Sequence, residues 1–143
     1  MPPYGYSEHI SDIGIAATGQ TLESAFEEGA AAMLNVMFDL GTIDEKTSVK
    51  ISAEARDIEM LFVEVLNEVL SVQGRDDVAL KRLECTEIKK TDAGFGFTGA
   101  AFGEAFSRAK HSVKTEVKGA TYSGLNYGKT PDGGHVLRCV LDV

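Results

Sequence analysis

The sequence predicts a single α+β domain in which a mixed or largely antiparallel sheet packs against two amphipathic helices. Three observations favour this fold class. Two segments carry apolar residues at helical spacing, the other apolar segments are short and strand-like, and most of those follow the second helical segment. The chain of 143 residues is 43% hydrophobic and 25% charged, which is typical of one folded domain, and we assign residues 1–143 to it.

The chain begins with two strand-like stretches, residues 4–10 and 13–17, between which the apolar residues change phase. The apolar residues occupy even positions up to Ile10 and odd positions from Ile13 onward. Because a strand alternates its faces with period two, this change indicates a bulge, bend or twist. Asp12 lies at the change, and such irregularities often direct a side chain into a functional site.

Two amphipathic helices are predicted. The first begins at Leu22, with Thr21 as its N-cap. The second covers residues 57–71 and is capped by Asp57. Each has a polar face opposite its apolar one, so each is expected to pack on another element without being buried all round. Two glycines just beyond the helices are the expected stop signals: Gly41 and Gly74.

The remaining apolar segments are predicted to be strands, over residues 47–53, 78–90, 95–102, 119–127 and 135–143. The sequence TPDGG at residues 130–134 is a strong turn signal that joins the last two strands into a hairpin. Residues 92–94 are expected to turn between the two strands before them.

The stretch GFGFTG at residues 94–99 matches the G-x-G-x-x-G pattern of dinucleotide-binding loops. That loop requires a turn from a strand into a helix, so that the pyrophosphate meets a helix N-terminus. Here a turn precedes the motif, and Phe95 and Phe97 alternate as they would in a strand. We therefore expect a glycine-rich strand with both phenylalanines on one face of the sheet.

Composition and the absence of motifs exclude several classes of protein. The 22 acidic and 14 basic residues give a formal charge of −8, so stable direct binding to nucleic acid is not expected. There is no signal-peptide pattern and no apolar run near the roughly 18 residues that span a bilayer, which predicts a cytoplasmic protein without a membrane segment.

Cys85 and Cys139 lie in apolar runs, which is typical of buried reduced thiols.

No catalytic constellation is visible in the sequence. The three histidines, His9, His111 and His135, lack the spacing of metal ligands, and no serine lies in a nucleophile-elbow motif. Glutamates of the second helix are spaced as on a solvated face.

The end of the chain places two carboxylates within one residue of each other. In HVLRCVLDV the odd positions form a core face, and Asp142 and the α-carboxylate of Val143 follow them. If the first and last strands are neighbours, Asp12 completes an oxygen-rich cluster that a hard cation such as Ca²⁺ or Mg²⁺ would stabilise. From the residues alone the plainer interpretation is favoured, in which Asp12 is a turn residue and Asp142 a solvated chain end.

Five segments resemble the archease family, in the same order and over nearly the whole chain: EHISDIGI, TLESAFEEGAAAMLNVM, LFVEVLNEVL, TEVKGATYSGL and the closing LDV. The resemblance implies a small α+β accessory protein of the RtcB-type RNA ligase that joins spliced tRNA halves. Such a protein promotes guanylylation of the ligase and its multiple turnover, and is not itself an enzyme.

The resemblance also implies site residues. The divalent-metal site of the family, seen with calcium, corresponds here to Asp12, Asp142 and the terminal carboxylate of Val143. The lysine of its Glu-Val-Lys block corresponds to Lys118, a functional candidate. This chain has Ile10 where the family commonly has threonine, which removes a hydroxyl but keeps the carboxylate. His9 is retained and is expected to be structural, because calcium rarely takes imidazole ligands.

Two alternatives from other classes stay open. A chaperone-like module would bind exposed segments of several partners through an accessible apolar groove. A small metal-dependent hydrolase would use Asp12 and Asp142 and would turn over a phosphate ester without a partner.

Overall fold

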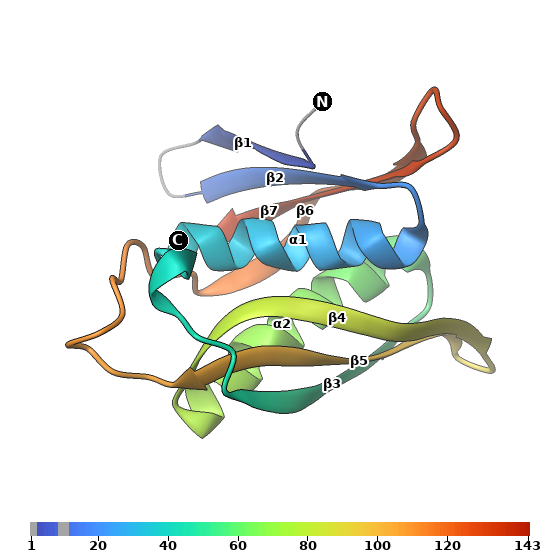
Figure 1. Ribbon diagram of the computed structural model, residues 1–143. Helices are drawn as coiled ribbons and strands as arrows, with labels where there is room; N and C mark the ends of the chain where they lie inside the picture. Colours follow the sequence, from blue (N-terminus) through green and yellow to red (C-terminus); the bar gives the residue numbers. More distant parts are fainter. Residues whose placement is uncertain (1–2, 9–11) are drawn as a thin grey trace.

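The computed structural model describes residues 3–8 and 12–143, which form three layers with two helices between two antiparallel sheets (Figure 1). The first sheet has the strand order β1-β2-β7-β6 and the second has β3-β5-β4. The described elements, in chain order, are β1 (Tyr4–Glu8), β2 (Asp12–Gly19), α1 (Leu22–Met37), the 3₁₀ helix η1 (Leu40–Thr42), β3 (Thr47–Ala55), α2 (Ile58–Asp76), β4 (Val78–Thr91), β5 (Gly94–Ala105), β6 (Gly119–Lys129) and β7 (His135–Asp142).

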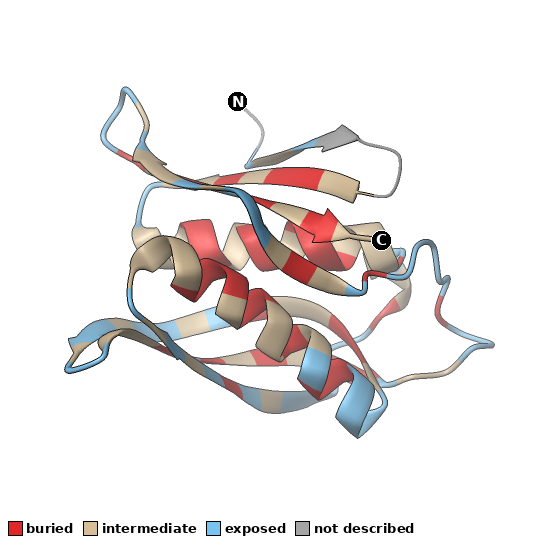
Figure 2. Ribbon diagram, turned by 180° about the vertical axis from the view of Figure 1, so that it is seen from behind, coloured by how far each residue is buried: buried red, intermediate tan, exposed pale blue. Residues whose placement is uncertain are grey.

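The predicted fold class is confirmed, but the strands divide into two sheets that share one layer of helices. Helix α1 contacts β2 of the first sheet and β4 of the second, and α2 contacts β6 and β3. At the centre of the core, the ring of Phe26 in α1 stacks on Phe97 of β5 at 5.7 Å and meets Phe62 of α2 edge-on at 5.5 Å. Figure 2 shows buried positions along both helices and alternating along the strands.

Helix α1 begins where the sequence predicts. The side-chain oxygen of Thr21 accepts from the Ser24 N–H at 3.0 Å, and the Ser24 hydroxyl oxygen accepts from the Thr21 N–H at 3.1 Å, which forms a capping box. The helix ends at Met37, before Gly41. Phe38 leaves the helix because it adopts an extended conformation and forms an isolated bridge with Val113.

Helix α2 also begins as predicted, since Asp57 accepts from the Met60 N–H at 2.8 Å. Its predicted end at residue 71 is wrong, because the helix continues through Gly74 to Asp76. The last turn is stabilised by tertiary contacts. Gln73 is buried, and its side-chain oxygen accepts from the N–H of Leu80 at 2.9 Å.

The N-terminal phase change marks a reversal of the chain, not a bulge or bend within a strand. Strands β1 and β2 pair antiparallel, with Tyr6 opposite Ile15 and Glu8 opposite Ile13. In this register an even-numbered residue of β1 lies opposite an odd-numbered residue of β2. Residues opposite each other share a face of the sheet, which explains why the apolar positions change from even to odd. Residues 9–11, which include His9 and Ile10, lie outside the described residues.

The later strands begin within one residue of their predicted starts, and both predicted turns are confirmed. Thr130 and Gly134 close the β6–β7 turn, with the Thr130 N–H donating to the Gly134 carbonyl at 3.0 Å. The GFGFTG stretch lies in β5, as expected for a glycine-rich strand, with no helix after it. Gly103 is required there, because a Cβ would overlap the Ala79 carbonyl oxygen of β4.

Both cysteines are free, with Cys139 buried and Cys85 half-buried. Burial raises the pKa of each thiol to about 12, so both are protonated at neutral pH and unreactive. No helix in the described part of the chain is long and apolar enough to cross a membrane.

The three-layer packing predicts opposite effects for one substitution at two helical glycines. Each Gly→Ala change gains up to ~1 kcal/mol of helix propensity. At Gly29 of α1 the new methyl group would overlap the buried ring of Phe62, whereas at Gly74 of α2 it meets nothing within 4 Å. We expect Gly29→Ala to lower the free energy of unfolding by on the order of 1–3 kcal/mol and Gly74→Ala to raise it, measured by urea denaturation. Equal shifts would contradict the close contact of the helices.

Candidate functional site

Asp12 and Asp142 are direct partners across the β2–β7 ladder, at the end of the first sheet where β2 begins and β7 ends. Side chains directly opposite in an antiparallel pair have Cβ atoms ~5 Å apart. Both aspartates are half-buried, and by alternation they lie on the outer face of the sheet, opposite the buried Leu137 and Leu141. The structure therefore places two like charges side by side.

Lys118 and Val143 lie at the same end of the sheet. Gly119 of β6 is the cross-strand partner of Asp142, and the N–H of Lys118 donates to the Asp142 carbonyl at 2.7 Å. Lys118 is exposed, and Val143 is half-buried with its side chain against the core. Figure 1 shows the C-terminus beside the start of β2. All four residues singled out in the sequence thus gather in one place, which we call the chain-end cluster: Asp12, Lys118, Asp142 and Val143.

The chain-end cluster contains two acidic side chains. Among residues 3–8 and 12–143 there is no group of three or more His, Cys, Asp and Glu side chains arranged to hold a metal ion. The third ligand expected from the sequence is the α-carboxylate of Val143.

Asn67 of α2 anchors the start of β6, directly after Lys118. Its amide nitrogen donates to the Ala120 carbonyl at 3.1 Å, and its oxygen accepts from the Ala120 N–H at 2.8 Å. The side chain thus satisfies both backbone groups of Ala120, as a neighbouring strand would. Sequence reasoning missed Asn67, because nothing local separates it from the polar residues beside it on the helix.

The loop between β5 and β6, residues 106–118, is anchored at its start by a buried polar pair. Nδ1 of His111 accepts from the Ser107 N–H at 2.9 Å, so the proton of the neutral ring is on Nε2, which donates to Glu104 at 2.9 Å. Glu104 also accepts from the Asp44 N–H at 2.9 Å and pairs with Lys110 at 2.8 Å. The spacing of His111 in the sequence predicts no role, and in the structure its two ring nitrogens stabilise the start of the loop.

The middle of this loop is bound to the end of α1. The N–H of Lys114 donates to the Met37 carbonyl at 2.8 Å, and its ammonium group donates to the Asn35 carbonyl at 2.6 Å. The loop is therefore held at three points: at Glu104, at the end of α1 and, through Ala120, at Asn67. These contacts fix the approach of Lys118 to Asp142.

His135 also has a structural environment. Its Nδ1 lies 2.7 Å from the Tyr127 hydroxyl, and the two rings stack. Burial lowers the pKa of its imidazole, with the charge of Lys129 acting in the same direction. His9 lies outside the described residues.

Comparison with known proteins identifies the family. The model of the Archease protein family (MTH1598/TM1083) matches residues 4–143. Protein archease of Pyrococcus abyssi is 32% identical over the whole of both chains, and that of Methanosarcina acetivorans is 34% identical over 91% of this chain and 89% of its own. The solution structure of Methanobacterium thermoautotrophicum protein 1598 superposes over the whole of both chains with a TM-score of 0.83 at 27% identity. The chain belongs to the archease family.

The Glu104 anchor predicts a pH-dependent stability. The Asp44 N–H, then His111 and Lys110, hold the pKa of the Glu104 carboxyl well below its ordinary value of 4.5. Its stabilising contribution is therefore complete above about pH 4.5 and is lost as the pH falls further. We expect Glu104→Gln to lower the free energy of unfolding more at pH 7 than at pH 3, measured by urea denaturation. Glu54→Gln, on an exposed strand position, is the control, and equal losses at both pH values would contradict the anchor.

Proposed function

We propose that this protein is an accessory activator of an RtcB-type RNA ligase, which promotes guanylylation of the ligase and its multiple turnover in tRNA splicing in the cytoplasm. Membership of the archease family supports an accessory role. The observation that carries the proposal is the chain-end cluster, in which the start of β2 with Asp12 meets the end of β7 with Asp142, and the Lys118 N–H bonds the Asp142 carbonyl.

The donor chemistry of the cluster fits a divalent cation, and we propose calcium. Two carboxylates directly opposite each other across a ladder destabilise the sheet unless a positive charge compensates them. Asp12, Asp142 and the terminal carboxylate of Val143 offer only oxygen ligands, which Ca²⁺ prefers. When bound, the cation would offset most of the negative charge of these carboxylates and remove their mutual repulsion.

The residues of the chain itself position the charges. The pairing of β2 with β7 sets the two carboxylates opposite each other, and the Lys118 N–H bond to the Asp142 carbonyl fixes the backbone of Lys118 beside that of Asp142. The side chain of Lys118 is exposed at this end of the sheet, where a partner can contact it. Since the formal charge of the chain is −8, a protein surface is a better partner for this protein than an RNA backbone.

The cation proposal predicts opposite stability changes in chelator and in calcium. In EDTA, we expect Asp12→Asn to raise the free energy of unfolding by up to ~1 kcal/mol, because it removes the like charge opposite Asp142. In millimolar Ca²⁺ the wild type should gain thermal stability and the variant much less. Asp92→Asn, in the β4–β5 turn, is the matched control and should gain as the wild type does. An equal calcium-dependent gain in Asp12→Asn would remove Asp12 from the ligand set.

The functional proposal is tested by multiple-turnover RNA ligation with the ligase of the same organism. We expect the wild type to stimulate turnover and Asp12→Ala to abolish the stimulation, with a retained fold checked by circular dichroism. Asp92→Ala serves as the control. No stimulation by the wild type would contradict the proposed function, and full stimulation by Asp12→Ala would contradict the site. Hydrolysis of a phosphate ester by the isolated protein with added divalent cation would indicate an enzyme instead.

A further inference from the structure

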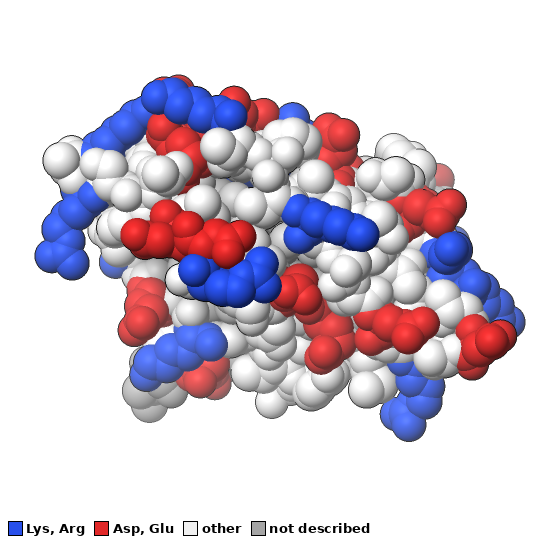
Figure 3. Space-filling view, turned by 90° about the horizontal axis from the view of Figure 1, so that it is seen from below, with Lys and Arg blue, Asp and Glu red and all other residues white. Residues whose placement is uncertain are grey.

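The outer faces of the two sheets differ in chemistry, although the central helices leave both uncovered. On the three-stranded sheet, Arg82 of β4 lies 4.3 Å above the Phe102 ring and pairs with Glu45 at 2.8 Å and Glu84 at 3.0 Å. Figure 3, seen from the side of this sheet, shows basic and acidic side chains interspersed over the surface. Such mixed charges are typical of a solvated face.

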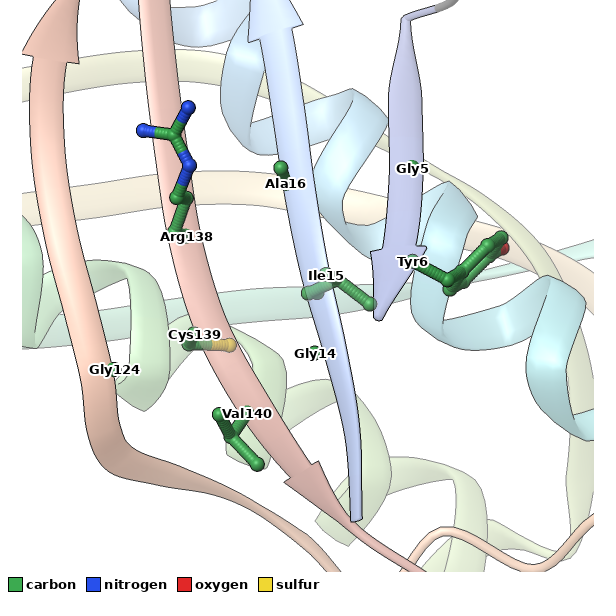
Figure 4. A pocket seen from close by; sticks show the side chains of 9 residues that line it. All are labelled: Gly5, Tyr6, Gly14, Ile15, Ala16, Gly124, Arg138, Cys139 and Val140. Carbon is green, nitrogen blue, oxygen red and sulfur yellow. The ribbon is translucent and has the colours of Figure 1, made fainter. Parts of the chain in front are cut away.

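The middle of the outer face of the four-stranded sheet carries small and apolar residues around Arg138, with polar residues such as Thr18 and Asn126 at their side. We call the small and apolar residues together with the arginine the Arg138 face: Gly5, Gly14, Ala16, Val136, Arg138 and Val140. Figure 4 shows this face with the helices behind it. Two hollows of about 480 and 370 Å³ lie on it, and Gly5, Ala16 and Arg138 line both. The surface of the sheet is hollowed here because Gly5 and Gly14 have no side chains.

Arg138 lies on the floor of these hollows without an acidic partner. Its cross-strand neighbours are Ala16 and Asn126, and its polar contact is a long hydrogen bond of 3.4 Å to the Asn126 side chain. Among the described residues, no carboxylate lies within 4 Å of its guanidinium, in contrast to Arg82. A guanidinium on an apolar floor is suited to bind a carboxylate in a bidentate manner once water is excluded.

The face also has a fixed arrangement of charge. Asp142 follows Arg138 by four positions on the same face of β7, which corresponds to roughly 13 Å along the strand. The cation of Arg138 is therefore near the centre of the face and the chain-end carboxylates are at its end. A complementary surface needs an acidic group in its middle and flat apolar contacts around it.

We infer that the Arg138 face is the docking surface for a partner protein, which lays an apolar segment on the glycine and alanine floor and places a carboxylate on Arg138. The inference rests on the proposed function, in which that partner is the RNA ligase. The formal charge of −8 repels a nucleic-acid backbone, and it also makes two copies of the chain repel each other. These observations favour a different protein as the occupant.

The first test measures the dissociation constant for the RtcB-type ligase of the same organism by isothermal titration calorimetry. We expect Arg138→Glu to weaken binding at least ~10-fold, because a carboxylate of the partner then meets a like charge. Lys50→Glu is the matched control, since it makes the same change in net charge on the outer face of the other sheet. It should change the dissociation constant by less than about twofold, as expected of a site outside the contact.

A second variant tests the shape of the floor independently of charge. A Cβ at Gly5 meets nothing within 4 Å and Gly5 lines both hollows, so Gly5→Leu adds a side chain to the floor without a clash at its Cβ. We expect it to weaken ligase binding severalfold, while Ser52→Leu, on the exposed face of β3, leaves binding unchanged. Thermal denaturation of all four variants checks that they fold.

Each outcome decides between the two proposals. A wild-type protein that neither binds nor stimulates the ligase overturns the proposed function and this inference with it. Tight wild-type binding that Arg138→Glu and Gly5→Leu leave unchanged overturns the docking surface alone. Concentration-dependent dimerisation that Arg138→Glu abolishes, with unchanged ligase affinity, would assign the face to a second copy of the chain and also overturn the inference.

Discussion

The antiparallel pairing of β2 with β7 is the interaction on which the site and much of the fold depend. It joins residues 12–19 to residues 135–142, so it closes a loop of more than a hundred residues. Closing so long a loop carries an entropic cost of several kcal/mol that local contacts cannot offset. Burial on the inner face offsets it, because Ile15, Ala17 and Leu137 become almost fully inaccessible against the helices. The chain-end cluster therefore forms because core packing holds β2 and β7 together.

The same pairing places a like-charge contact where a neutral pair would be more stable. Asp12 and Asp142 face each other at the end of the ladder, and the Lys118 N–H bond to the Asp142 carbonyl adds no compensating charge of its own. Proteins retain such unfavourable local arrangements mainly where a ligand or partner compensates them. The arrangement supports a binding role for this end of the sheet more directly than the residue types do.

Local signals in the sequence were sufficient for the beginnings of elements and insufficient for features set by distant contacts. Thr21 and Asp57 mark the helix starts through hydrogen bonds to the next turn. The end of α2 depends instead on Gln73 and its bond to Leu80, which carry the helix through Gly74. The division of the strands between two sheets depends on long-range pairing in the same way.

The site shows the same division. The change of apolar phase near Asp12 is visible in the sequence. It arises because the chain reverses between β1 and β2, so that even positions of one strand lie opposite odd positions of the other. Asn67 and Glu104 are invisible to such reasoning, since each acts through a partner brought close only by the fold. Family resemblance supplied the link from Asp12 to Asp142, which periodicity alone left open.

Strand β7 connects the core, the cluster and the Arg138 face in one rigid element. Its odd positions, including Leu137 and Leu141, are buried, and its even positions carry Arg138 and Asp142 on the outer face. A slip of one residue in its register would exchange these two sets, so the packing of the core fixes where both charges lie. The spacing between the guanidinium and the carboxylate is thus set by the backbone of one strand. A partner that contacts both charges therefore contacts two groups whose separation the hydrophobic core maintains.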